Sequence, residues 1–223
     1  MMTDFEKFAV SQGIGTNKLD EYAKYNIKNG IIEPYILEER TLNCAPMSVF
    51  SRLMYDKIIF LGSGINDDVA NIITAQLLYL NSVTDKDEDI KMFINSPGGS
   101  VIDGLAIYDV MNFVEPDVAT YCMGMCASMG SILVSSGTKG KRFTLPNGEV
   151  MIHQVSGGAS GQFSDMEIAV KHAGRLQDTL YGILAANTGK DIEQIRKDAD
   201  RDNWFTAQEA VDYGLIDKIV TKK

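Results

Sequence analysis

The fold is indicated most clearly by residues 118–130, which read Val118-Ala119-Thr120-Tyr121-Cys122-Met123-Gly124-Met125-Cys126-Ala127-Ser128-Met129-Gly130. The stretch begins with apolar and β-branched residues that predict a strand over residues 118–123. We expect this strand to break at Gly124 and the chain to restart as a helix near residues 126–134. A strand that leads through a glycine into a helix is typical of an α/β domain.

The same order of strand and helix recurs on both sides of this stretch. Apolar runs predict strands at residues 57–61 and 90–94, and each is followed by the 3.6-residue period of a helix. Asn66 or Asp67 can cap the first of these helices. Two more strands are predicted at residues 141–145 and 149–154. The alternation predicts an α/β fold with a largely parallel sheet.

A long helix is predicted after the glycine-rich loop at residues 156–162. Ser164 and Glu167 have the spacing of a capping box, and Gly189 can end the helix. Residues 164–188 would form a helix about 37 Å long at ~1.5 Å per residue. Because this exceeds what one small domain needs to cover a sheet, we expect part of the helix to project and pack against another subunit.

A second capping box is predicted near the C-terminus. Thr206 and Glu209 have the required spacing, and Gly214 can close the helix that they begin. Residues 215–220 then predict a last strand.

Composition excludes several classes of function. The chain has 223 residues, and its 21 basic against 30 acidic side chains give a net charge of −9, which disfavours binding to nucleic acid or to an anionic membrane. No apolar run approaches the roughly 18 residues that span a bilayer, and the N-terminus lacks the features of a secretory signal. Three cysteines are too few for a disulfide framework, so we expect a cytoplasmic protein.

Residues 1–30 differ in character from the rest, with mixed charges and glycine breaks. We expect them to be an N-terminal extension ahead of a single domain at residues 31–223. Two interpretations stay open: a propeptide removed by a cut near Gly30, and a retained surface arm.

Ser128 is the candidate nucleophile. It falls in the expected first turn of a helix, where unpaired backbone amides can hold an oxyanion beside an attacking hydroxyl. The alternative is that Ser128 merely caps this helix, and Cys126 is a second candidate nucleophile whose other role is packing. The glycine spacing does not match a Gly-x-Ser-x-Gly elbow.

The candidate base is one of only two histidines. His153 ends an apolar strand just before a flexible loop, where a parallel sheet presents catalytic groups, although it could also be a core or edge histidine. His172 lies within the long helix and is expected in solvent. Spacing does not select the acid among Asp198, Asp200 and Asp202.

The remaining motifs are weaker. Gly98-Gly99 could form an oxyanion nest or a plain turn. Cys44, Cys122 and Cys126 do not have the pattern of a zinc site, so no metal is expected.

Five motifs in register carry a resemblance to a known family. They are Ile94-Asn95-Ser96-Pro97-Gly98-Gly99, Gly124-x-x-Ala127-Ser128-Met129-Gly130, Lys139-Gly140-Lys141-Arg142-Phe143, Met151-Ile152-His153-Gln154 and Arg201-Asp202. Together they resemble the ClpP family, serine peptidases that partner AAA+ unfoldases, over about residues 34–221.

The resemblance implies a site and a reaction. Ser128 would be the nucleophile, His153 the base and Asp202 its orienting acid, with the amides of Gly99 and Met129 as oxyanion donors. The order of the three residues along the chain is unrestricted, because geometry defines a triad. The expected activity is serine endopeptidase cleavage of unfolded polypeptides to short peptides, without a metal or an organic cofactor.

The resemblance also implies a fold and an assembly. The fold would be a ClpP/crotonase-like spiral of ββα units with a protruding handle helix, here the long helix. Two stacked seven-membered rings of this chain would form, with the handle and residues 156–162 between them. A hexameric AAA+ ATPase, the unfoldase, would dock at pockets that include Phe93 and Phe113.

Two departures from the family pattern bear on these expectations. Val155 stands where a proline is usual, which puts the start of the inter-ring strand in question. Lys91 stands where many members have an aromatic pocket residue, which puts unfoldase docking in question.

Two other functions stay open at this point. A crotonase-type acyl-CoA enzyme shares the fold and also holds an oxyanion with paired amides, but it does not need the set of Ser128, His153 and Asp202. A non-catalytic ring subunit is the third interpretation, since fold alone does not determine function.

Overall fold

The computed structural model describes residues 35–40 and 43–222. By its contacts the chain separates into two units, one ending at Arg52 and one beginning at Leu53, and each is described by itself. The extension expected at residues 1–30 and the cut expected near Gly30 lie outside the described residues.

The first unit contains a β-hairpin. Strand β1 (Tyr35–Arg40) pairs antiparallel with β2 (Asn43–Ser48). Helix α3 (Val49–Tyr55) follows directly and crosses the boundary between the units. The Ser48 hydroxyl accepts a hydrogen bond from the Phe50 amide, which satisfies one of the free donors at the start of α3.

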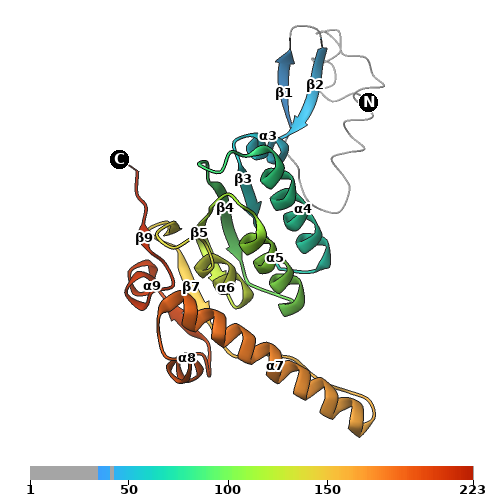
Figure 1. Ribbon diagram of the computed structural model, residues 1–223, viewed down its shortest axis with the longest axis vertical. Helices are drawn as coiled ribbons and strands as arrows, with labels where there is room; N and C mark the ends of the chain where they lie inside the picture. The colour runs from blue at the N-terminus through green and yellow to red at the C-terminus, as the bar shows by residue number, and fades with distance from the viewer. Residues whose placement is uncertain (1–34, 41–42, 223) are drawn as a thin grey trace, which may run out of the picture. The chain divides into compact units, whose positions relative to one another are not determined.

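The second unit is built on one mixed sheet, drawn in Figure 1. Its main path runs in the order β3 (Ile58–Leu61), β4 (Ile90–Ser96), β5 (Val118–Ala127), β6 (Arg142–Thr144) and β9 (Lys218–Ile219). Off this path, β7 (Glu149–Ile152) pairs with β5, and β8 (Asn203–Phe205) pairs with β7. Every pair in this sheet is parallel except β7 with β8, which confirms the predicted α/β fold with a largely parallel sheet.

Six helices of the second unit complete the described fold. They are α4 (Asp67–Val83), α5 (Val101–Phe113), α6 (Met129–Ser135), α7 (Phe163–Thr188), α8 (Ile192–Asp198) and α9 (Ala207–Tyr213). Helices α4 and α5 lie side by side against the sheet (Figure 1). The predicted cap of α4 is confirmed, since the Asn66 side chain accepts a hydrogen bond from the Val69 amide at 2.9 Å.

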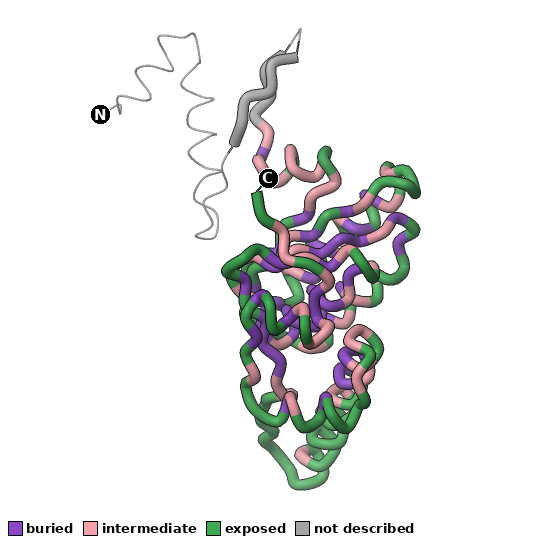
Figure 2. Tube along the Cα trace, turned by 90° about the vertical axis from the view of Figure 1, so that its left-hand side faces the viewer, coloured by how far each residue is buried: buried purple, intermediate pink, exposed green. Residues whose placement is uncertain are grey.

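The core lies between the sheet and these helices. Along β4 buried residues alternate with more exposed ones, so Met92 and Ile94 face inward. Ile107 and Met111 of α5 are one turn apart and are buried against the sheet. Figure 2 shows the buried trace concentrated in the middle of this unit.

The prediction that the strand ends at Gly124 is wrong. Strand β5 continues to Ala127, and Gly124 lies within it with φ of +64°. The strand changes partners at this glycine: residues before it pair with β6, and residues after it pair with β7. A bulge allows the change, because a left-handed glycine can bend a strand without ending it.

The long helix α7 begins one residue earlier than predicted. Its N-cap is Gln162, which makes no side-chain capping bond, so Ser164 lies inside the helix and the predicted capping box there is wrong. Gly189, with φ of +74°, ends the helix as predicted. The buried side chains of α7 are confined to Leu180 through Leu184, and its N-terminal part projects beyond the sheet (Figure 1).

The second predicted capping box is confirmed. Thr206 and Glu209 hydrogen-bond reciprocally at the start of α9, and Gly214 ends that helix. The last strand is shorter than expected, since β9 contains only two residues.

Candidate active site

Ser128 lies between the end of β5 and the start of α6 in an uncommon backbone conformation. Its φ is +54° and its ψ is −121°. A residue other than glycine adopts this backbone conformation only at an energetic cost. The conformation is held from both sides: the Ser128 amide donates to the Met151 carbonyl at 2.9 Å, and its carbonyl accepts from the Ser131 hydroxyl at 2.6 Å. The side chain makes no capping bond, so its hydroxyl is available for other contacts.

The chain crosses very close to Ser128 at Gly98. A Cβ on Gly98 would lie 2.7 Å from the Ser128 Cβ and 2.9 Å from the Met129 amide nitrogen. Real Cβ atoms essentially never lie this close to a non-bonded atom, so no residue other than glycine fits here without a shift of its neighbours. The turn at Gly98-Gly99 is therefore packed directly against the candidate nucleophile.

His153 and Asp202 are brought together by the pairing of β7 with β8. In this antiparallel pair Ile152 lies opposite Asn203, so the next positions along, His153 and Asp202, lie opposite each other just beyond the strand ends. The Nδ1 atom of His153 is 2.9 Å from the Asp202 Oδ1 atom.

The same histidine reaches Ser128 on its other side. Its Nε2 atom is 2.8 Å from the Ser128 Oγ atom. The structure therefore brings the three residues named from the sequence into one line of hydrogen bonds.

The two other candidate acids face elsewhere. Asp198 accepts hydrogen bonds from Gln194 and from the Tyr213 hydroxyl. Asp200 lies beside Arg201, and its backbone carbonyl accepts from the Gln154 side chain at 2.6 Å. Of the three aspartates that spacing left open, Asp202 alone hydrogen-bonds His153 within the described residues.

The amides of Gly99 and Met129 are free beside this line. Within residues 35–40 and 43–222 neither amide donates to another protein group. Gly99 has φ of +150°, and its loop is fixed by hydrogen bonds on either side between Ile65 and the residues Gly98 and Ser100. Free amides beside a serine hydroxyl are suited to hold a developing oxyanion.

A cavity opens next to these groups. Its lining includes Ser128, Met129 and His153 together with apolar side chains of α5, α6 and α7, among them Val101, Ile132 and Leu184. Val155 also lines it, so this departure from the family pattern lies at the site itself. An apolar cavity beside the serine can take an apolar side chain of a substrate.

Neither of the alternative reactive residues is favoured by its surroundings. Cys126 is fully buried, and that burial raises the pKa of its thiol well above the ordinary value, so it is a poor nucleophile. His172 is exposed on α7, and an Arg175 nitrogen lies 3.4 Å from its Nδ1 atom. No group of three metal-binding side chains occurs in the described part of the chain.

The two residues expected at an unfoldase-docking pocket differ in exposure. Phe93 is half-buried and stacks on Tyr121 with ring centroids 4.5 Å apart, and Tyr121 in turn contacts Phe143. Phe113, at the end of α5, is 71% exposed. Lys91 is exposed on β4, two residues before Phe93.

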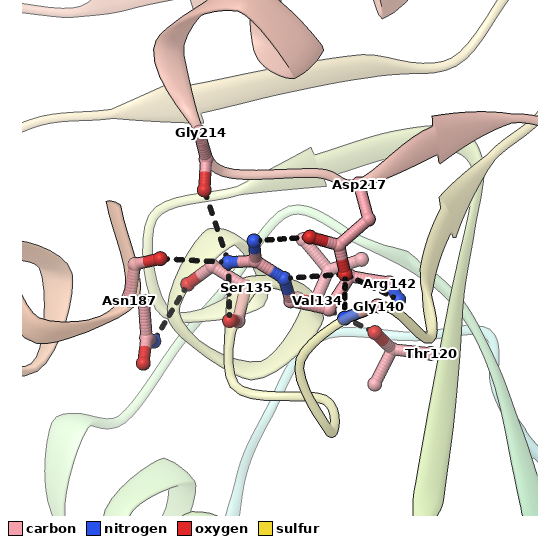
Figure 3. A network of polar contacts seen from close by, with 8 residues as sticks. All are labelled: Thr120, Val134, Ser135, Gly140, Arg142, Asn187, Gly214 and Asp217. Carbon is pink, nitrogen blue, oxygen red and sulfur yellow. Dashed lines mark hydrogen bonds and ion pairs between the residues drawn. The ribbon is translucent and has the colours of Figure 1, made fainter. Parts of the chain in front are cut away.

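The sequence did not predict that Arg142 is the centre of a buried hydrogen-bond network. Its guanidinium is buried and donates to the carbonyls of Ser135, Asn187 and Gly214, as Figure 3 shows. It also forms an ion pair with Asp217, with Nη2 2.5 Å from Oδ1. The three carbonyls belong to the C-terminal ends of α6, α7 and α9, so one cation satisfies acceptors that helix ends leave free.

An α/β fold with a largely parallel sheet, in which a serine, a histidine and an aspartate form one line of hydrogen bonds beside free amides, is typical of the class of serine hydrolases. Comparison with known proteins narrows the class. The family model for Clp protease matches residues 43–223.

Three relatives match over nearly the whole chain, and each is called an ATP-dependent Clp protease proteolytic subunit. The protein of Porphyromonas gingivalis W83 is 53% identical over 99% of both chains. Those of Bacteroides fragilis YCH46 and Bacteroides thetaiotaomicron VPI-5482 are 52% and 51% identical over 100% of both chains. The chain belongs to the Clp protease family, and it is a serine peptidase with the fold expected from the resemblance. The crotonase-type alternative is not supported.

Across the described residues, no helix is both long enough and apolar enough to span a bilayer.

Proposed function

We propose that this chain is the proteolytic subunit of an ATP-dependent protease and cuts unfolded polypeptides into short peptides through Ser128, His153 and Asp202. The observation that carries the proposal is the unbroken line from Ser128 Oγ through His153 to Asp202, with separations of 2.8 and 2.9 Å. The names of the relatives support the substrate class and the need for an ATPase.

In the first step, His153 Nε2 takes the proton of the Ser128 hydroxyl as its oxygen attacks the peptide carbonyl. Asp202 accepts a hydrogen bond from Nδ1, which fixes the tautomer that leaves Nε2 free and stabilises the imidazolium. The amides of Gly99 and Met129 hold the oxyanion of the tetrahedral intermediate.

The second half of the reaction returns the enzyme to its starting state. His153 gives the proton to the departing amine, and an acyl ester remains on Ser128. Water then attacks the ester with His153 as base, which releases the carboxylate product and restores the hydroxyl. No metal or organic cofactor takes part in these steps, and the partner hydrolyses the ATP.

The proposed assembly is two stacked seven-membered rings of this chain, in the cytoplasm and without nucleic acid. The projecting part of α7 supports a contact between subunits, because Phe163, Ile168 and Val170 are each at least 66% exposed there. Phe93 and Phe113 are proposed to receive a hexameric AAA+ unfoldase, with Lys91 modifying that surface.

The test compares the wild type with Ser128→Ala. We expect the wild type to hydrolyse a small fluorogenic peptide without ATPase and to be labelled by a fluorophosphonate on Ser128, and the variant to do neither while keeping its assembly. Labelling that survives in Ser128→Ala would contradict the assignment. A wild type with no peptide hydrolysis would favour the non-catalytic ring subunit.

We further propose that residues 1–30 are a propeptide that the enzyme removes near Gly30. Intact masses of the wild type and Ser128→Ala, expressed identically, decide this point. Loss of the segment from the wild type alone supports self-processing, and equal trimming of both proteins points to host proteases.

A further inference from the structure

Strand β5 carries two thiols that the proposed reaction does not use. Cys122 and Cys126 are both free and fully buried. Cys126 lies two residues before Ser128, and Cys122 lies at the point where β5 leaves β6.

The bulge at Gly124 brings the two cysteines together. Cys122 pairs with Ile94 of β4, whereas Cys126 pairs with Ser96. Four steps along β5 thus match only two steps along β4. Two steps of a parallel strand span about 6.6 Å, so the two cysteine Cα atoms lie about that far apart. Disulfides bridge Cα separations up to about 6.8 Å, whereas an unbulged strand would hold these residues about 13 Å apart.

The two side chains also face each other. Residues 94 and 96 of β4 point to the same face of the sheet, and their partners Cys122 and Cys126 point with them. The thiols are in mutual contact: hydrogen bonding to Cys126 lowers the pKa of Cys122, whereas burial raises the pKa of Cys126. Cys122 is therefore the thiol to which the attacking role is assigned.

We propose that Cys122 and Cys126 form a redox-active dithiol, which closes into a disulfide within β5 and thereby lowers the peptidase activity of Ser128. The oxidant is a small hydroperoxide. The Cys122 thiolate attacks the peroxide oxygen, the O–O bond breaks, and a sulfenic acid and hydroxide (or alkoxide) form. The Cys126 thiol then displaces the sulfenic oxygen as water, and each sulfur has lost one electron to the peroxide. A reducing dithiol reverses the step by exchange.

Access to the dithiol is from the turn between β6 and β7. The Cys122 sulfur donates to the Glu149 carbonyl, and a Cβ on Gly148 would lie 3.2 Å from that sulfur. Pro146 and Asn147 of the same turn are exposed. Opening of the turn admits a peroxide, so oxidation is expected to be slower than that of a surface thiol.

Closure of the disulfide acts on the site through the backbone. The usual Cα separation in a disulfide is about 5.5–6 Å, so the bulge must tighten. Residues Met125, Cys126 and Ala127 hold the pairing with β7, and Ser128 and the Met129 amide follow directly. A shift here misplaces the hydroxyl relative to His153 and the free amides, and a misplacement of about 1 Å can cost about 100-fold in rate.

The test uses the full chain and hydrogen peroxide, followed by alkylation of free thiols and trypsin. Cys122 and Cys126 fall on one tryptic peptide, residues 92–139, which contains no other cysteine, while Cys44 falls on residues 41–52. We expect the oxidised peptide to lose two hydrogens and carry no alkyl group. Oxidised methionine adds oxygen and is therefore distinguished.

Activity is measured on the same samples. We expect wild-type hydrolysis of a fluorogenic peptide to fall at least fivefold on oxidation and to recover with dithiothreitol. The variants Cys122→Ala and Cys126→Ala keep every methionine, so methionine oxidation can still occur in them. Both variants should nevertheless lack the loss of activity that dithiothreitol reverses. Cys44→Ala is the matched control and should keep it.

The expected change in the rate of peptide hydrolysis rests on the proposed function. The expected mass of the tryptic peptide 92–139 does not. If both thiols of residues 92–139 are still alkylated after peroxide treatment, or if the disulfide forms and hydrolysis is unchanged, the switch is overturned. If the reduced wild type does not hydrolyse peptides at all, the proposed function fails, while the mass still decides whether the dithiol closes.

Discussion

Gly98 lies so close to Ser128 that its missing side chain is a requirement of the site. We predict that Gly98→Ala lowers kcat/KM for peptide hydrolysis by about 100-fold, because the new Cβ displaces the Ser128 side chain and the Met129 amide from their positions in the site. Hydrolysis of a fluorogenic peptide and fluorophosphonate labelling measure the loss.

Gly140→Ala is the matched control for this change. Gly140 has φ of +87°, close to the +90° of Gly98, but a Cβ there meets nothing within 4 Å. Both variants carry the backbone cost of about 1–2 kcal/mol, so any difference in activity reports the contact with Ser128. Equal activities of the two variants would contradict the packing argument.

Asp202 is the residue whose role the sequence alone left open. We predict that Asp202→Asn keeps the fold but lowers kcat by up to about 10⁴-fold, because an amide can stabilise the wrong tautomer of His153. Asp198→Asn should keep kcat within a few-fold, since that carboxylate accepts from Tyr213 and Gln194 instead. Steady-state kinetics on the two purified variants decide between them, and the reverse result would move the acid role to Asp198.

The local identity of the site was predictable, but its geometry was not. The apolar pattern predicted Ser128 in the first turn of a helix after one strand, and it predicted His153 at the end of another strand. The choice of Asp202 depends on the register of β7 against β8, two strands separated by 50 residues of chain. Nothing in local spacing encodes that register, so only the resemblance selected Asp202 in advance.

Predictions of helix starts and strand ends were correct where neighbouring residues determine the structure. They were wrong where a residue distant in sequence determines it. The caps at Asn66 and Thr206 formed because each side chain bonds its own helix. Strand β5 passed beyond Gly124 because β7 offers a new partner there. Ser164 did not become a cap because helix α7 starts before it.

Helix α7 combines two different surfaces, which the apolar pattern alone did not separate. Ile183 is buried inside its own subunit, whereas Ile168 is 67% exposed on the projecting part. A charge at Ile183 would therefore test the core of the subunit, and a charge at Ile168 tests contact with another subunit.

We predict that Ile168→Glu shifts the assembly towards single rings or smaller species and lowers peptidase activity with it, because burying an unpaired carboxylate costs several kcal/mol. Thr179→Glu adds the same charge at an exposed position of α7 outside the projecting segment and should leave the size unchanged. Sedimentation velocity measures both. An unchanged size for Ile168→Glu would mean that this face lies outside any subunit contact.

On the scale of the whole second unit, Arg142 joins parts that are distant in sequence. Its guanidinium holds the ends of α6, α7 and α9 together with Asp217 ahead of β9 (Figure 3). Helix α6 begins at the residue after Ser128, so the network fixes the far end of the helix that carries one of the proposed oxyanion donors. The sequence could not show this, because Arg142 stands in a run that also reads as an ordinary basic surface strand.

The network of Arg142 and Asp217 predicts that the free energy of unfolding decreases at acidic pH. Burial alone would raise the pKa of Asp217, but the hydrogen bonds from Arg142 and Gly140 outweigh it, and the pKa is lowered overall. A carboxyl group whose pKa is lower in the folded state stabilises the fold above its unfolded pKa of about 3.9, and this contribution is lost as the pH falls below that value. Breaking a buried ion pair costs about 3–5 kcal/mol, and we expect the lower end for Asp217→Asn because the amide oxygen can still accept from Arg142.

Thermal unfolding from pH 7 to pH 3, at one fixed protein concentration, tests this prediction. Asp217→Asn should melt well below the wild type at pH 7. The difference should shrink as the pH falls below about 4, because the unfolded wild-type chain then takes up a proton at Asp217 more readily than the folded protein does. Asp87→Asn removes an exposed carboxylate instead and should follow the wild type at every pH. A difference between Asp217→Asn and the wild type that stays constant down to pH 3 would show that the carboxylate charge does not stabilise the network, and that Asp217 acts only through the shape of its hydrogen bonds.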